Sequence, residues 1–163
     1  MSETVIWRID DRFIHGQVVV GWCSQLPIRH LVVCDNSIAG NEWDRELLLM
    51  AVPPTIQAEV LTVGETAQQA SSWNSPKNFT MVILESIEVL QELLDHKTDI
   101  KKVIVGGIHY KPGRREYLSY VFLTPAEVQA LKEISNRNIT VTAQDLPTST
   151  SHDMMKVIAR KGH

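Results

Sequence analysis

Residues 4–18 read TVIWRIDDRFIHGQV, and the character of the chain changes twice within this stretch. β-Branched and aromatic residues come first and predict a strand over Thr4–Ile9. A polar loop, Asp10–His15, follows the strand, and Gly16 opens a segment that we expect to be helical. A strand that leads through a loop into a helix begins a βαβ unit, from which parallel sheets are built.

Short runs rich in valine, isoleucine or threonine recur along the chain and predict further strands. They are His30–Cys34, Gln57–Val63, Phe79–Leu84, Lys102–Val105 and Ile139–Ala143, with Tyr117–Leu123 as a candidate for one more. Helical patterns lie between them over Gly16–Gln25, Asn41–Val52, Glu65–Trp73, Ile87–His96, Pro125–Asn136 and Ser151–Ala159. We predict one α/β domain over residues 1–163, with three layers. Its central sheet would be mainly parallel, of about six or seven strands, with helices on both faces.

The composition excludes several classes of protein. The 16 basic and 19 acidic residues give a net charge of −3 without any basic run, which argues against binding to nucleic acid. The apolar runs are far shorter than the ~20 residues that span a bilayer, and the charged first twelve residues do not resemble a signal peptide. Cys23 and Cys34 match neither a disulfide framework nor a zinc site. We expect a protein of the reducing cytoplasm.

The loop after the first strand carries the chemistry. Ligands of open parallel sheets bind outside the carboxyl ends of the strands. A nucleophilic imidazole at His15 suits phosphoryl transfer, because it is largely neutral near pH 7 and remains reactive once phosphorylated. Arg12 offers a planar fork of donors, and the unpaired N–H groups of a helix starting at Gly16 would face an anion. Asp10 would hold Arg12, or fix the tautomer of the imidazole.

Other residues are weaker candidates for phosphate binding. Gln17 lies in the expected first helical turn, and Ser86 follows the strand Phe79–Leu84. Gly107 and His109 follow the strand Lys102–Val105. Arg8 and Asp11 suit a structural ion pair or a solvent-exposed position as well as they suit the site.

The run Arg8–Val18 resembles the active-site loop of a known family, the IIB subunits of the mannose/fructose/sorbose family of the bacterial sugar phosphotransferase system. Three further pieces match in the family's order, so that the resemblance covers nearly the whole chain. They are MAVPP at Met50–Pro54, GGIH at Gly106–His109 and YVFLT at Tyr120–Thr124. Phe13 stands where leucine is usual in the family.

The resemblance implies a phosphocarrier. His15 would accept a phosphoryl group from a histidine of a IIA subunit and pass it to a sugar that enters through the membrane subunits IIC and IID. Asp10 and Arg12 would support phosphate binding and the conformation of the loop. The resemblance also implies the same α/β fold, a homodimer, and a cytoplasmic location that is peripheral to the inner membrane face through the partner subunits. It implies no cofactor and no metal.

Three alternatives remain open at this point. A regulatory phosphoprotein would use the same His15 without sugar transport, because the acceptor is not encoded in the donor loop. A metal-dependent hydrolase using His15, Asp10 and Asp11 is disfavoured, since Arg12 is a poor neighbour for a cation. A nucleotide-binding domain is disfavoured by the lack of GxGxxG and GxxxxGK[ST] runs. The identity of the sugar is not encoded in the loop.

Overall fold

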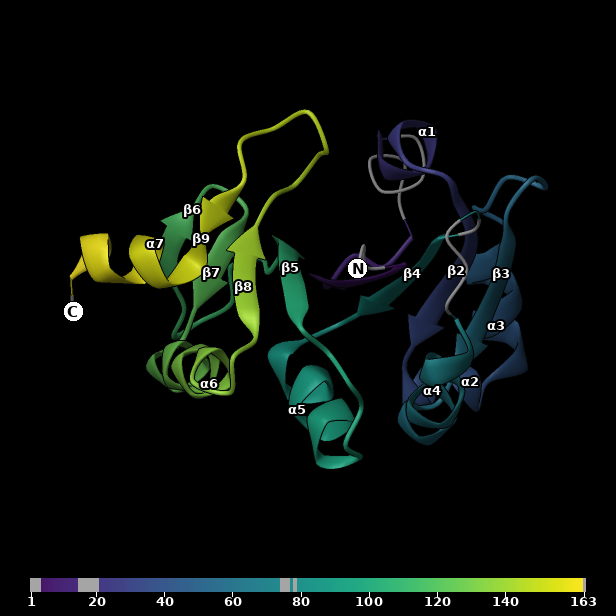
Figure 1. Ribbon diagram of the computed structural model, residues 1–163, viewed down its shortest axis with the longest axis horizontal. Helices are drawn as coiled ribbons and strands as arrows, with labels where there is room; N and C mark the ends of the chain where they lie inside the picture. Colours follow the sequence, from purple (N-terminus) through teal and green to yellow (C-terminus); the bar gives the residue numbers. More distant parts are fainter. Residues whose placement is uncertain (1–3, 15–20, 74–76, 78, 163) are drawn as a thin grey trace.

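The structure is a computed structural model that describes residues 4–14, 21–73, 77 and 79–162. Within these residues, strands form a seven-stranded sheet in the order β3-β2-β4-β1-β5-β8-β9 (Figure 1). The strands are β1 Val5–Asp10, β2 Ile28–Cys34, β3 Gln57–Leu61, β4 Phe79–Leu84, β5 Lys102–Gly107, β8 Thr140–Ala143 and β9 His152–Asp153. Neighbouring strands are parallel, except that β9 is antiparallel to β8. The predicted α/β fold with a mainly parallel sheet is confirmed.

The first strand lies at the centre of this sheet. Strand β1 pairs with β4 on one side and with β5 on the other, so that Ile9 lies opposite Leu84 and Asp10 lies opposite Gly107. Parallel neighbours end at the same edge of a sheet. The residues that follow β1, β4 and β5 are therefore brought together at the edge where ligands of such sheets bind.

Alternation along β1 separates two apolar cores. Trp7 and Ile9 belong to one core, and Ile6 borders the other, on the face to which Arg8 and Asp10 also belong. Helices α4 Val63–Gln69, α5 Ile87–Asp95, α6 Pro125–Ser135 and α7 Met154–Lys161 cover the first core. Helices α1 Cys23–Gln25, α2 Asn36–Ala39 and α3 Glu42–Leu49 cover part of the second. The predicted three layers are thus present, with α4, α5 and α6 in a row in Figure 1.

Polar residues at the carboxyl edge start the helices that follow. Asp35 and Ser86 cap α2 and α5 by accepting the backbone N–H groups of Ile38 and Val89. Thr124 and Glu127 form a capping box at the start of α6, which confirms the sequence-based interpretation of that helix.

Several predicted boundaries were wrong. A second capping box, formed by Thr62 and Glu65, ends β3 at Leu61 and starts α4 at Val63, so the strand predicted over Gln57–Val63 is shorter. The helix predicted over Asn41–Val52 ends at Leu49, ahead of Pro53. In place of a helix over Ser151–Ala159, the short strand β9 precedes α7, which Asp153 caps. Of the helix predicted over Gly16–Gln25, residues 15–20 lie outside the described part; Gly21 and Trp22 are π-helical and lead into α1.

The segment predicted as one short strand over Tyr117–Leu123 is a hairpin. Strands β6 Arg115–Leu118 and β7 Val121–Leu123 form a separate antiparallel pair. Beside β5, the backbone N–H of Ile108 donates to the Tyr120 carbonyl, and the N–H of Phe122 donates to the Ile108 carbonyl, which ties this hairpin to the end of that strand. The chain reverses around Ser119 inside a run of seven residues that contains no glycine or proline, and a single serine is too weak a turn signal, so the sequence pattern missed the hairpin.

The two cysteines are free, as expected, and both are at least partly buried. Burial raises the pKa of the Cys34 thiol to about 11 and also raises that of Cys23. Within the described residues, no helix is long and apolar enough to cross a membrane.

The capping box of α6 gives a test of the fold. Thr124→Ala removes the side-chain oxygen that accepts the Glu127 N–H at 3.1 Å, so we expect it to lower the free energy of unfolding by about 1 kcal/mol. Urea unfolding followed by circular dichroism measures the change. Thr148→Ala, at an exposed loop position, is the control. Equal stability of the two variants would show that this cap does not stabilise α6.

Candidate phosphate site

The site is built from the turn that follows β1. Asp10 is fully buried, and its Oδ1 accepts a hydrogen bond from the backbone N–H of Arg12 at 3.0 Å and another from Arg12 Nε at 3.2 Å. The backbone N–H of Phe13 closes the turn on the Asp10 carbonyl, and Phe13 adopts a left-handed conformation with φ of 57°. The Arg12 side chain is 35% exposed. Its guanidinium is thus fixed by a buried carboxylate while part of it faces solvent.

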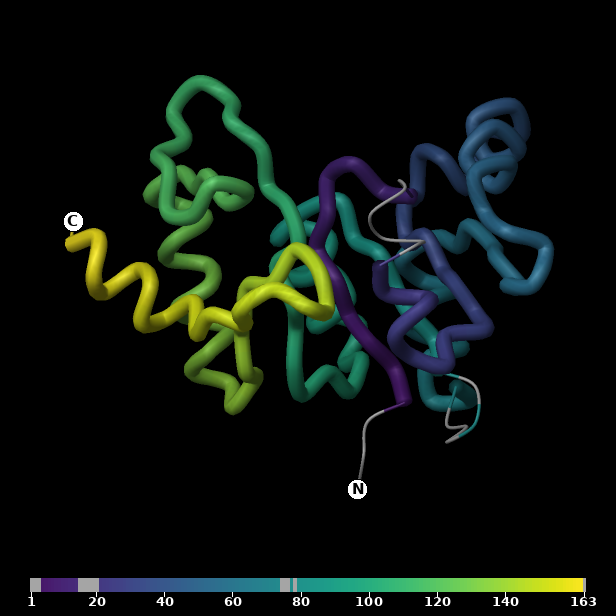
Figure 2. Tube along the Cα trace, turned by 90° about the horizontal axis from the view of Figure 1, so that it is seen from above, coloured from purple at the N-terminus to yellow at the C-terminus, as the bar shows by residue number. Residues whose placement is uncertain are grey.

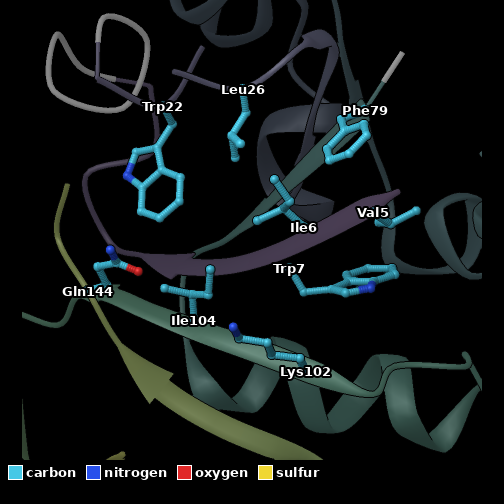
Figure 3. A pocket seen from close by; sticks show the side chains of 9 residues that line it. All are labelled: Val5, Ile6, Trp7, Trp22, Leu26, Phe79, Lys102, Ile104 and Gln144. Carbon is cyan, nitrogen blue, oxygen red and sulfur yellow. The ribbon is translucent and has the colours of Figure 1, made fainter. Parts of the chain in front are cut away.

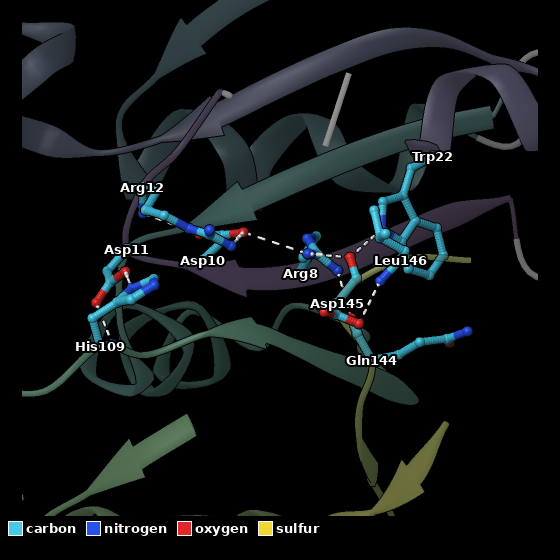
Figure 4. A network of polar contacts seen from close by, with 9 residues as sticks. All are labelled: Arg8, Asp10, Asp11, Arg12, Trp22, His109, Gln144, Asp145 and Leu146. Atoms are coloured by element: carbon cyan, nitrogen blue, oxygen red, sulfur yellow. Dashed lines mark hydrogen bonds and ion pairs between the residues drawn. The ribbon is translucent and has the colours of Figure 1, made fainter. Parts of the chain in front are cut away.

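A second carboxylate in the same turn reaches β5. Asp11 accepts hydrogen bonds from the backbone N–H of His109 at 2.8 Å and from His109 Nδ1 at 2.5 Å (Figure 4). An ionised carboxylate can only accept, so Nδ1 carries the hydrogen, and Nε2 is left as the other polar atom of the ring. The His109 side chain is 44% exposed. The structure therefore brings His109 to the loop, as the sequence had suggested, through an aspartate whose role the sequence left open.

Gly107 is where these groups meet. A Cβ atom at Gly107 would lie 3.2 Å from Arg12 Nη2, 3.2 Å from Asp10 Oδ1 and 3.3 Å from His109 Cε1. A side chain there would crowd all three groups, so the glycine leaves the space in which they converge. Gly107 supplies this room at the end of β5, and its backbone carbonyl accepts the N–H of Asp11 at 3.1 Å.

Arg8 lies behind the turn and is fully buried. Its guanidinium donates to Asp10 Oδ2 at 3.4 Å and to the backbone carbonyls of Gln144 and Asp145 at 2.8 and 2.9 Å. Burial lowers the pKa of Arg8, while the neighbouring Asp10 opposes that shift. The segment after β8 thus lies beside β1 (Figure 2). The sequence left Arg8 between an ion pair and a solvent position. In the structure β1 extends to Asp10, one residue beyond the predicted strand, so the two-residue spacing puts Arg8 and Asp10 on one face.

Arg114 is a further residue that the sequence did not single out. Its guanidinium forms a two-pronged ion pair with Glu127 at 3.0 and 3.1 Å, and its Nη1 donates to the carbonyl of His109 at 2.7 Å. The start of α6 is thereby tied to the segment that carries His109. Only the pairing of β5 with the β6–β7 hairpin brings these residues together, so no local signal could have shown the contact.

Carboxylates also line the edge beyond β4. Glu85 follows β4, and burial together with a hydrogen bond and charge repulsion from Asp35 raises the pKa of the Glu85 carboxyl. Ser86, next in the chain, has its hydroxyl engaged as the cap of α5. A contact of Ser86 with phosphate stays a prediction.

Residues His15, Gly16 and Gln17 lie outside the described residues. Ile14, just before the segment 15–20, and Trp22, two residues after it, are both buried, however. Ile14 is buried in the second core, and the Trp22 indole, also buried, donates from Nε1 to the Asp145 carbonyl at 2.9 Å. The described residues Ile14 and Trp22 are therefore both fixed in the protein interior.

A pocket of about 260 Å³ lies on the same face of the sheet, toward the start of β1 (Figure 3). Its walls are mainly apolar and include Ile6, Trp22, Leu26 and Phe79. Lys102 and Gln144 are its polar lining residues, so the pocket lacks the cluster of donors that a phosphoryl group requires. In the described part of the chain, no cluster of three or more histidine, cysteine or acidic side chains has the arrangement to hold a metal ion.

Known proteins are similar to this chain in sequence and in fold. The PTS system fructose-specific EIIB component of Bacillus subtilis is 27% identical over 158 residues, which are 97% of each chain. The PTS system mannose-specific EIIAB component of Escherichia coli is 26% identical over 94% of this chain, and the match spans 47% of that longer protein. The crystal structure of manxB from Thermoanaerobacter tengcongensis superposes with a TM-score of 0.87 at 26% identity, covering 99% of this chain and 100% of that one.

The agreement of fold extends to a more distant structure. The IIBSor domain of the sorbose permease from Klebsiella pneumoniae has a TM-score of 0.83 at 21% identity, over 98% of this chain and 99% of that one. The family model described as "PTS system sorbose subfamily IIB component" matches residues 4–163. This chain therefore belongs to the sorbose-subfamily IIB components of the phosphotransferase system, as the resemblance of its first loop had indicated.

Proposed function

We propose that this chain is a phosphocarrier that receives a phosphoryl group on His15 and passes it to a sugar. The observation that carries the proposal is the Arg12 guanidinium, which Asp10 holds in place three positions before His15. A phosphoryl group in transfer spreads negative charge over three oxygens, and fixed donors stabilise that charge without reorganising. Arg12 is part exposed and part fixed, which suits a donor that must meet an incoming group.

The chemistry is two successive transfers. An unprotonated ring nitrogen of His15 attacks phosphorus while the bond from phosphorus to the donor nitrogen breaks, which leaves the donor imidazole neutral once a proton is regained. In the second step the hydroxyl oxygen of the sugar attacks the same phosphorus, the bond to His15 breaks, and the hydroxyl proton leaves to a base or to water. Arg12, Gly107 and the His109 ring line the place in which the group would pass. Gly16 and Gln17 are proposed to add donors from the start of the following helix.

The name of one relative supports a proposal for the partners of this chain. The name of the E. coli relative joins an A and a B component, and we propose an A component as the donor for this chain. Membrane IIC and IID subunits would present the sugar. The homodimer stays a prediction, which light scattering on the purified protein would test.

The acceptor residue can be tested directly. Incubation with enzyme I, HPr, a cognate IIA and phosphoenolpyruvate should add one phosphoryl group that is labile in acid and stable in base, because it is bound to nitrogen. His15→Ala should abolish the label, as intact-protein mass spectrometry would report. His96→Ala, at an exposed position that ends α5, should keep it. Label that survives His15→Ala and maps to His109 would refute the proposal.

The role of Arg12 gives a second test. Arg12→Lys keeps the charge but loses the planar fork that contacts Asp10 through Nε. Removing one fixed donor from a developing anion costs about 10²–10³ in rate, so we expect transfer from the phosphorylated donor to slow by that order. Rapid-quench kinetics measure it, with Arg115→Lys on the exposed edge of β6 as the matched control. A rate equal to that of the control would place Arg12 outside the phosphate site.

The carboxylates near the site give a test in pH. The pKa of Glu85 is raised in the folded chain, so the folded state binds the proton more tightly than the unfolded state does. The protonated Glu85 carboxyl therefore stabilises the folded state at low pH, and this contribution is lost as the pH rises above the ordinary carboxyl pKa of about 4.3. We expect Glu85→Gln to be more stable than the wild type near pH 7.5, a difference that vanishes near pH 4.

Urea unfolding at both pH values measures this difference. Glu116→Gln, at an exposed position on β6, is the control and should show a small difference at either pH. A Glu85→Gln variant that is less stable than the wild type at pH 7.5 would mean that the charged carboxylate stabilises the fold.

A further inference from the structure

Arg8 is a cation placed where a strand normally carries an apolar side chain. Arg8 lies in β1, which pairs with β4 on one side and with β5 on the other, and the Arg8 side chain has no exposed surface. Its Nε has no hydrogen-bond partner among the described residues. Burying such a charge is costly even when it is paired, and a well-packed apolar residue often gives equal or better stability. Stability alone is therefore a poor reason for an arginine at this position.

The contacts of Arg8 join segments that are far apart in the sequence. Two of its nitrogens donate to the carbonyls of Gln144 and Asp145, in the irregular segment after β8. The Asp145 carbonyl also accepts the indole N–H of Trp22, and the Arg8 guanidinium lies 5.2 Å from the centre of the Trp22 ring. Figure 4 shows Arg8 between Asp10 on one side and Asp145, Gln144 and Trp22 on the other. Arg8 thus connects β1, Trp22 and the segment after β8.

The neighbouring strand is adapted to this guanidinium. A Cβ atom at Gly106 would lie 2.1 Å from Arg8 Cζ and 2.3 Å from Nη2, far inside any permitted contact. Nothing but glycine leaves room for the Arg8 side chain in its present place. Gly107 has a weaker effect on Arg12, since a Cβ atom there would lie 3.2 Å from Arg12 Nη2, which is tight but not impossible.

One carboxylate connects the two arginines. Asp10 Oδ2 accepts from Arg8 Nη2 at 3.4 Å and from Arg12 Nη2 at 3.5 Å, while Oδ1 accepts from the backbone N–H and Nε of Arg12. Because both arginines share Oδ2, a rotation of the carboxylate after the loss of the Arg8 contact would change both side-chain contacts of Arg12. The direction of the Arg12 guanidinium then depends on Arg8, although Arg8 is too buried to meet a phosphoryl group itself.

We infer that Arg8 is a positioning residue of the phosphate site: it sets the direction of Arg12 through Asp10 and holds Trp22 against the segment after β8. Its effect on the rate rests on the proposed function, whereas its effect on Arg12 does not. A spectroscopic readout of Arg12 can therefore be separated from a kinetic one.

The test uses Arg8→Lys in the full chain. Lysine keeps the charge, but its single nitrogen cannot reach Asp10 and both carbonyls as the guanidinium does. The Nε–H resonance of Arg12 in a ¹⁵N NMR spectrum is assigned as the signal that Arg12→Lys removes. In Arg8→Lys we expect it to move toward the position of a solvated arginine. The first-order rate of transfer at saturating phosphorylated IIA should fall about 10²-fold, with the apparent KM for IIA unchanged, because a displaced group costs about that factor.

Two further variants keep the test decisive. Gly106→Ala retains every donor but forces the Arg8 guanidinium out of its place, and it should move the Arg12 signal in the same way. This variant decides the matter if Arg8→Lys does not fold. Leu131→Ala, in the buried face of α6, is the control for a general loss of stability and should leave both the Arg12 signal and the rate unchanged.

The outcomes separate the inference from the function. An unchanged Arg12 signal in a folded Arg8→Lys or Gly106→Ala variant overturns the inference, whatever the rate. An equal shift in Leu131→Ala also overturns it, since the shift would then follow general loss of stability. If the wild type accepts no phosphoryl group, the proposed function fails, and the Arg12 signal still decides the role of Arg8.

Discussion

The buried carboxylate of Asp10 is the group on which this site depends. An ionised carboxylate out of water is tolerated only where donors surround it, and Asp10 accepts from Arg8, from Arg12 and from the backbone of the turn. Each of those donors is fixed in return. The turn at Phe13, the direction of Arg12 and the packing of Arg8 are therefore three consequences of one charge at the end of the central strand.

Two arginines share that carboxylate and have opposite surroundings. Arg8 belongs to the sheet, where alternation along β1 turns it into the protein, while Arg12 lies past the end of the strand and keeps a third of its side chain in solvent. A ligand can reach only the second. The first strand thus divides one charge network into a part that fixes geometry and a part that is free to meet an anion. The Asp11–His109 pair on the side of β5 is similar, because Asp11 is the more buried partner and His109 the more exposed one.

Local signals predicted those parts of the structure that local forces decide. Phe79–Leu84 forms β4 as predicted, and the Thr124 cap lies where the sequence placed it. The loop Asp10–His15 was singled out because its residue types suit phosphate, and that role stays a prediction. Contacts made across the sheet could not be read in this way. The burial of Arg8 depends on Gly106 and on the segment after β8, and the role of Asp11 depends on the pairing of β1 with β5.

The central place of β1 has a consequence for the order in which the molecule is made. Strand β1 is translated before its neighbours β4 and β5 and before the residues Gln144 and Asp145, whose carbonyls accept from Arg8. During synthesis, the Arg8 side chain therefore lacks its two carbonyl acceptors until residue 145 has emerged. A chain whose translation stops before residue 145 cannot complete the contacts that hold Arg8 behind the turn after β1.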